Sequence, residues 1–262
     1  VYSFANDNPY RIEFFGDSII RGALWSDGKF RLRPGKDFPE LAAMGFEVRN
    51  NGIIGSTIRK GAKVLERRLA SLDEHTLVIM DFGGNDCDLN WDEVNEDPDS
   101  FHDGKTPLSL FRDTLAQFIA EARVRRQEPV AVLPPPLEAE RYYRWICQGR
   151  NAERILRYLG DTHHIYRWQE RYANAVREAA QALDCPVLDL RTPFLDPRDY
   201  PGLMCLDGIH PNEAGHRLMA DAVLRELKKR DLVSASPPEV WKPRKSLLQY
   251  KELREGENLF CP

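Results

Sequence analysis

The feature that most constrains the fold is a series of short apolar segments separated by longer amphipathic ones. The apolar segments occupy residues 11–15, 45–50, 76–82, 129–133 and 186–190. Between them, apolar residues recur at helical spacing, as in 58–72 and 166–183. This alternation predicts parallel strands joined by right-handed helical crossovers. We therefore expect an α/β protein, a three-layer α/β/α sandwich of flavodoxin-like topology with about five parallel strands.

Several predicted strands end in turns rich in glycine and polar residues. The first ends in Gly16-Asp17-Ser18, the second in residues 51–57 and the third in residues 83–86. The carboxyl ends of parallel strands meet at one edge of a sheet, where α/β folds place their chemistry. Ser18 is therefore the candidate nucleophile, with Ile19-Ile20 predicted to begin the next helix. A capped helix start would show the same short pattern.

A second polar turn precedes the helix predicted for residues 213–230. Asp207 and His210 are three residues apart, so the carboxylate can reach one imidazole nitrogen while the other points away. An ordinary helix-capping turn would fit the same residues. A serine hydroxyl becomes an effective nucleophile only when a base removes its proton. His210 is the candidate base, and Asp207 would hold its ring.

Acyl transfer also needs hydrogen-bond donors for the oxyanion of the tetrahedral intermediate. The candidates are the backbone N–H of Ser18, the backbone N–H of Gly55 and the side-chain amide of Asn85. Asp17 is expected to brace the turn rather than to react. A phosphate-binding sheet is the competing interpretation, but the chain has no Gly-x-x-x-x-Gly-Lys loop and His210 would have no role in it.

Taken together, these stretches resemble the SGNH (GDSL-like) hydrolase family, in the order that family uses. Gly16-Asp17-Ser18 matches its first block, residues 51–57 its second, 83–86 its third and 207–210 its last. The resemblance extends from about residue 11 to residue 230. Ile19 replaces the leucine of the family signature, a conservative change outside the chemistry. The resemblance implies a carboxylic ester hydrolase that uses no metal and no cofactor.

Residues 87–107 are predicted to overhang the site and to influence the choice of substrate. Between residues 88 and 97 this segment is acidic, with Trp91 and Val94 as its only large apolar residues apart from Leu89. A fatty chain needs a continuous apolar groove, because each buried methylene contributes about 0.8 kcal/mol. Sugar hydroxyls instead need polar partners and an aromatic face. We therefore expect a short acyl group, acetyl, on a polar carrier such as a sugar, with Trp91 in contact with the substrate.

Other readings of the function stay open at this point. A lipase-like, lysophospholipase-like or thioesterase-like acyl hydrolase would use the same motifs on another ester. A non-catalytic module that binds acylated sugars would keep the fold but have little need for Ser18, Asn85 and His210 together.

Composition limits the classes of binding partner that the chain is expected to have. With 37 basic and 41 acidic residues, the net charge of -4 gives no reason to expect nucleic acid or an anionic membrane as a partner. No stretch approaches the roughly 18 apolar residues of a membrane span. The five cysteines are scattered, and His163-His164 lacks further ligands at metal-binding spacing. With no signal pattern visible at the start, we expect a reducing, cytoplasmic location.

The chain is expected to form one domain and a tail. Residues 1–231 would be the catalytic domain, and residues 232–262, rich in proline and charge, a tail that packs on the body or on a neighbouring subunit of a homo-oligomer. The aromatic-rich stretch 137–170 is predicted to form two short helices that pack against the body or line a substrate platform.

Overall fold

A computed structural model describes residues 11–26, 28–35, 37–74 and 76–229 of the protein. Its main sheet has five parallel strands in the order β4-β1-β5-β6-β7. These are β1 (Arg11–Gly16), β4 (Glu47–Asn50), β5 (Leu77–Asp81), β6 (Glu128–Leu133) and β7 (Val187–Asp189). Numbered within this sheet alone, the order is 2-1-3-4-5, which is the flavodoxin-like order. The predicted fold class is confirmed.

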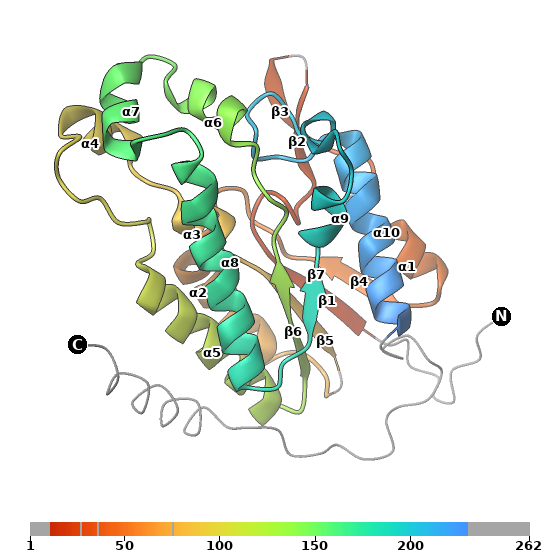
Figure 1. Cartoon of the computed structure of the whole chain (residues 1–262). Helices are drawn as coiled ribbons and strands as arrows, with labels where there is room; N and C mark the ends of the chain where they lie inside the picture. Colours follow the sequence, from red (N-terminus) through yellow and green to blue (C-terminus); the bar gives the residue numbers. More distant parts are fainter. Residues whose placement is uncertain (1–10, 27, 36, 75, 230–262) are drawn as a thin grey trace.

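Helices cover both faces of the sheet, so that it forms the middle of three layers (Figure 1). One face packs against α2 (Ile58–Leu69), α5 (Leu108–Val124) and α8 (His164–Ala182). The other packs against α1 (Pro39–Ala43), α9 (Thr192–Leu195) and α10 (Glu213–Lys229). Strand residues alternate between the two cores because successive side chains point to opposite faces. Val78 and Met80 join the first core and Leu77 and Ile79 the second.

The helix predicted to begin at Ile19-Ile20 is not formed, and that prediction is wrong. The chain turns back after Ser18, whose carbonyl accepts a hydrogen bond from the N–H of Ala23 at 2.8 Å. Gly22 adopts a φ of 80°, in the left-handed region that glycine tolerates and that ends a helical path. An antiparallel hairpin follows, formed by β2 (Ala23–Ser26) and β3 (Lys29–Leu32).

A separate cluster of short helices lies at the carboxyl edge of the sheet, at the end toward which the strand arrows point (Figure 1). It consists of α4 (Trp91–Glu96), α6 (Ala139–Ile146) and α7 (Ala152–Leu159), which share a small apolar core of their own. The two helices predicted for residues 137–170 are thus confirmed as α6 and α7. A single turn of helix, α3 (Gly84–Cys87), connects this cluster to β5.

The remaining chain leads to the turn that carries Asp207. A 3₁₀ turn, η1 (Tyr200–Leu203), follows α9 and precedes an isolated bridge between Met204 and Pro211. Within the described residues, no helix combines the length and the apolar character that a membrane crossing would require. The predicted tail, residues 232–262, lies outside the described residues.

Candidate active site

Ser18 and His210 meet although they are 192 residues apart in the sequence. Ser18 Oγ lies 2.8 Å from His210 Nε2, and His210 Nδ1 lies 2.6 Å from Asp207 Oδ2. Asp207 is fully buried. In this chain of hydrogen bonds the carboxylate accepts from the Nδ1–H, which leaves Nε2 free to accept a proton from the serine.

The turn of Asp207 is held by its own backbone and by α6. Asp207 Oδ1 accepts from the N–H groups of Ile209 and His210, both at 3.1 Å. Gly208 adopts a φ of 75°, and a Cβ at this position would lie 2.6 Å from the carbonyl oxygen of Glu138. The Gly208 carbonyl in turn accepts from the N–H of Glu138 at 2.7 Å. Only glycine therefore allows α6 to begin so close to this turn.

The turn of Ser18 is braced by Asp17, the role expected of that residue. Asp17 Oδ1 accepts from the N–H of Ile19 at 2.8 Å, and Asp17 itself is 3% exposed. Gly16 permits the close approach of β5, because a Cβ there would lie 2.4 Å from the Asp81 carbonyl oxygen. The serine is therefore presented at the end of β1 on a tightly packed turn.

The candidate oxyanion donors occupy different surroundings. Asn85, in α3, lies beside Ser18 in the lining of a cavity, and its Nδ2 donates to Asp17 Oδ2 at 3.0 Å. Gly55 lies on an exposed turn with a φ of 69°, and it is not among the residues that line this cavity. The structure thus groups Ser18 with Asn85 and leaves Gly55 outside the lining of the cavity. The donor role of Gly55 stays a prediction.

Two residues that sequence reasoning missed hold the turn 51–57 against β1. Asn50, buried at the end of β4, donates from Nδ2 to the Ile20 carbonyl at 2.7 Å and accepts at Oδ1 from the Gly52 N–H at 2.9 Å. It thereby links the turn after Ser18 to the turn that carries Gly55. Glu13 is the second such residue, and a charged side chain inside an apolar strand was the signal that could have identified it.

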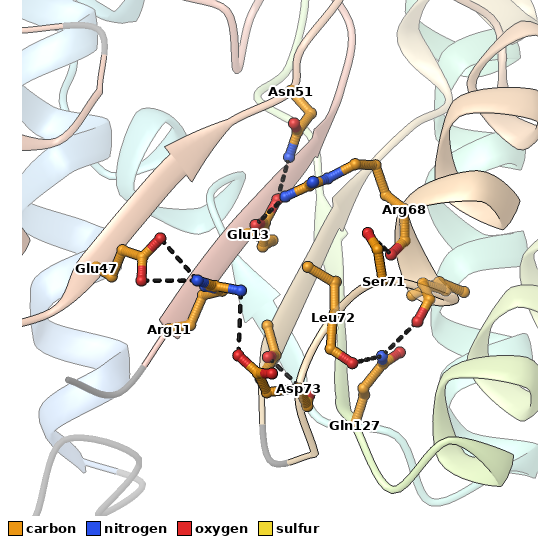
Figure 2. A network of polar contacts seen from close by, with 11 residues as sticks. Arg11, Glu13, Glu47, Asn51, Arg68, Ser71, Leu72, Asp73 and Gln127 are labelled. Carbon is orange, nitrogen blue, oxygen red and sulfur yellow. Dashed lines mark hydrogen bonds and ion pairs between the residues drawn. The ribbon is translucent and has the colours of Figure 1, made fainter. Parts of the chain in front are cut away.

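Figure 2 shows how Glu13 acts as an anchor in the middle of β1. Its carboxylate accepts from Asn51 Nδ2 at 2.6 Å and from Arg68 of α2 at 2.6 Å, and its side chain is fully buried. A buried carboxylate is stable only with such partners. This network fixes the beginning of the turn 51–57 to the strand that carries the nucleophile.

Three further buried carboxylates lie behind the nucleophile. Burial raises the pKa of Asp17, and burial together with the neighbouring Asp17 raises the pKa of Asp81 well above its ordinary value. Asp81 Oδ2 has no hydrogen-bond partner among the described residues, which agrees with a protonated acid. Burial also raises the pKa of Asp86 to about 6, against the opposing effect of hydrogen bonds from the N–H groups of Ile58 and Gly83.

The cavity beside Ser18 has a volume of about 70 Å³ and opens between the sheet edge and the short helices. Ser18, Asn85 and His210 all line it. Its apolar lining comes from Leu89, Trp91, Leu137, Leu159, Ile165 and Trp168. Of the polar residues between 87 and 107, only Asp88 lines the cavity, so the expectation of a mainly polar lining from this segment is wrong. The reason is that α4 is amphipathic: it buries Trp91 and Val94 and exposes its acidic residues.

Trp91 thus reaches the cavity, but its indole N–H already donates a hydrogen bond within the protein. Its Nε1 donates to Asp88 Oδ1 at 2.9 Å, and the Tyr142 hydroxyl donates to the same oxygen. Lys105 completes the set by an ion pair with Asp88 at 2.6 Å. Trp91 therefore offers carbon surface, and its contact with a substrate stays a prediction.

The adjacent histidines His163 and His164 lie in different surroundings. His164 lines the cavity, where burial lowers its pKa, whereas His163 is exposed. Within the described part of the chain, no three histidine, cysteine or acidic side chains gather closely enough to hold a metal ion.

Known proteins resemble the chain over most of its length. A human protein, isoamyl acetate-hydrolyzing esterase 1 homolog, is 25% identical over 213 residues, which are 80% of this chain and 77% of the human protein. The crystal structure of a lipase/acylhydrolase from Enterococcus faecalis superimposes with a TM-score of 0.58 at 23% identity, covering 84% of this chain and 96% of the other.

A catalytic mutant of an acetylxylan esterase from Geobacillus stearothermophilus superimposes equally well, with a TM-score of 0.58 at 20% identity, covering 83% of this chain and 94% of the other. At such identities the solved structures show a shared fold. The sequence itself matches the GDSL-like lipase/acylhydrolase family over residues 14–218. The chain is therefore a hydrolase of carboxylic ester bonds and belongs to the GDSL-like lipase/acylhydrolase family.

Proposed function

We propose that the protein hydrolyses short-chain carboxylic esters through an acyl-enzyme formed on Ser18. The observation that carries this proposal is the continuous contact from Ser18 Oγ to His210 Nε2 and from His210 Nδ1 to Asp207, at 2.8 and 2.6 Å. His210 takes the serine proton as Oγ attacks the ester carbonyl carbon. The buried Asp207 carboxylate stabilises the imidazolium that forms.

The rest of the cycle uses the same groups. The oxyanion of the tetrahedral intermediate accepts from the Ser18 N–H and from Asn85, with Gly55 as the third donor. Collapse of the intermediate breaks the bond to the alcohol oxygen, which receives the proton from His210. A water then attacks the acyl-enzyme, with His210 again as the base, and releases the acid and the free serine.

For the acyl group we keep acetyl as the first candidate. The name of the human relative supports this choice, because isoamyl acetate is an ester of acetic acid. The lining of the cavity fits poorly with the sugar carrier expected from the sequence, since the residues around it offer mostly carbon surface. The same apolar lining favours a second candidate, a hydrolase for longer acyl groups that would occupy the cavity.

Two measurements test the proposal. A fluorophosphonate should add once to the intact protein by mass spectrometry and not at all to Ser18→Ala. A comparison of kcat/KM for aryl acetate, butyrate and octanoate, beside acetate release from acetylated xylose, then identifies the acyl group. A steady rise towards octanoate would favour the second candidate. Labelling that persists in Ser18→Ala would contradict the assignment of the nucleophile.

A further inference from the structure

Three aromatic side chains gather beside His210 but outside the lining of the cavity. Phe30, on β3, packs edge-on against the His210 ring with 4.9 Å between ring centroids. Trp25, on β2, lies 4.8 Å from Phe30 and 5.0 Å from Trp145 of α6. Phe30 leaves 45% of its surface exposed although it touches a residue of the site. We call Trp25, Phe30 and Trp145 the aromatic patch.

The aromatic patch is held in place by the structure around it. Trp25 and Phe30 are cross-strand partners in the β2–β3 hairpin. The backbone N–H of Trp25 donates to Cys205 Sγ at 3.2 Å, two residues before Asp207. At the base of the hairpin, His216 Nε2 of α10 bonds the Ala23 carbonyl at 3.0 Å. Figure 1 shows the hairpin and α6 at the same end of the molecule.

The chemistry of the site says which part of an ester comes near this patch. His210 Nε2 must give its proton to the alcohol oxygen, so that oxygen lies at hydrogen-bond distance, about 3 Å, from Nε2 in the transition state. The oxyanion points elsewhere, towards Ser18 and Asn85. The first atoms attached to the alcohol oxygen therefore start beside His210, whose ring is already in contact with Phe30.

We propose that the aromatic patch binds the alcohol part of the ester, and that this part is an apolar alkyl or aryl group. The inference rests on the proposed function and deepens it by naming the leaving-group site. The patch presents aromatic carbon. Leu206 adds apolar surface: it is 71% exposed and directly follows Cys205, to which the Trp25 N–H donates. Each methylene that such a surface buries raises kcat/KM by up to about fourfold.

The test uses two series of substrates with Phe30→Ala. One series keeps the acetyl group and changes the alcohol from methyl to butyl, 3-methylbutyl and phenylethyl. The other keeps the methyl alcohol and changes the acyl group from acetyl to butanoyl and hexanoyl. Phe101→Ala is the matched control, because Phe101 is an aromatic residue with 77% exposure that does not line the cavity. Phe30→Leu is a milder second variant that keeps an apolar side chain.

In the unchanged protein we expect kcat/KM to rise at least about tenfold from methyl to 3-methylbutyl acetate, since several carbons are added. Phe30→Ala should reduce that rise to less than about threefold, whereas the acyl series should keep its own dependence on chain length. Phe30→Leu should keep part of the rise. Phe101→Ala should leave both series unchanged.

Four outcomes would overturn the inference. An equal fall for all acetates would mean that Phe30 acts only by positioning His210. A change confined to the acyl series would place the acyl group at the patch. Unchanged dependence on the alcohol, with Ser18 still labelled by the fluorophosphonate, would refute the leaving-group site alone. Absence of both turnover and labelling would refute the proposed function, and the inference with it.

Discussion

Asn85 donates a hydrogen bond from Nδ2 to Asp17 Oδ2 at 3.0 Å. A side-chain amide has two N–H groups and one carbonyl oxygen, whereas a carboxylate only accepts. Asp17 therefore holds the nitrogen of Asn85, not its oxygen, on the side of Ser18. One N–H is used in this bond, and the proposed oxyanion role would use the other. Asp17 thereby serves as a positioning residue for Asn85, in addition to bracing the turn at Ile19.

The substitution Asp17→Asn tests this relationship. The new amide oxygen can still accept from the Ile19 N–H, which places the new N–H₂ group against Asn85. Asn85 must then turn its oxygen to that group and lose its donor to the oxyanion. We expect kcat to fall about 10²-fold with KM little changed, as for loss of one oxyanion donor. Steady-state kinetics on an aryl acetate measures both constants.

A double-mutant cycle separates this effect from simple damage to the turn. In an Asn85→Ala background, Asp17→Asn should cost little more, because the donor is already gone. Asp81→Asn is the control, since Asp81 is an equally buried neighbouring carboxylate and should change kcat by less than about threefold. Losses that multiply in the double mutant would show that Asp17 does not act through Asn85.

Ser18→Ala and His210→Ala should each abolish turnover. Nucleophile and base act as one unit, so we expect kcat to fall by about 10⁴ to 10⁶ in each single variant and hardly further in the double variant. Circular dichroism serves as the control for folding. Residual activity of more than a few per cent in Ser18→Ala would reject the proposed nucleophile.

Glu13 and Glu47 provide a matched pair for stability, since they lie on the paired strands β1 and β4 and each meets an arginine (Figure 2). Glu13 is fully buried and bonded to Arg68 and Asn51, whereas Glu47 bonds Arg11 with 41% of its side chain exposed. In Glu13→Gln, the new amide N–H₂ group faces either Arg68 or Asn51, both of which are donors. This mismatch should lower the free energy of unfolding by about 2 to 3 kcal/mol. Glu47→Gln should cost less than about 1 kcal/mol. Urea denaturation measures both, and equal costs would show that the buried network does not hold the turn.

His216 should make the protein less stable in acid. Burial chiefly lowers the pKa of His216 from 6.5 to about 4, with Arg33 and His210 adding to the effect and the Ala23 carbonyl opposing it. The unfolded chain therefore binds more protons than the folded one between these values. The stabilising contribution is complete above about pH 6.5 and is lost as the pH falls to about 4. At about 1.4 kcal/mol per pKa unit, the loss approaches ~3 kcal/mol.

The variant His216→Gln keeps a donor for the Ala23 carbonyl and removes the titration. Its free energy of unfolding, measured by urea denaturation between pH 4 and 7, should fall less steeply on acidification than that of the unchanged protein. His163→Gln is the control, because His163 is exposed. Parallel curves for His216→Gln and the unchanged protein would contradict the prediction.

Several features of this protein follow from the sequence because they depend on residues close together in the chain. A parallel strand buried on both faces must be a continuous apolar run, as in residues 77–81, and a glycine-rich turn must follow where the chain leaves the sheet. The apolar runs therefore predicted the strands, their parallel arrangement and the edge at which Ser18 and Asn85 would lie. The anchoring role of Glu13 was missed because a single charged residue in a strand does not indicate which distant residues will bind it.

Other features were decided only by tertiary structure, since they depend on contacts between distant segments. The amphipathic pattern of residues 91–97 does not say which face meets the cavity, and packing against α6 and α7 turned its apolar face inward. Nothing local in residues 19–32 pairs Trp25 with Phe30 or places Phe30 on His210. Those contacts arise because the turn at Gly22 sends the chain back over the sheet edge, where the final turn of the fold presents the histidine.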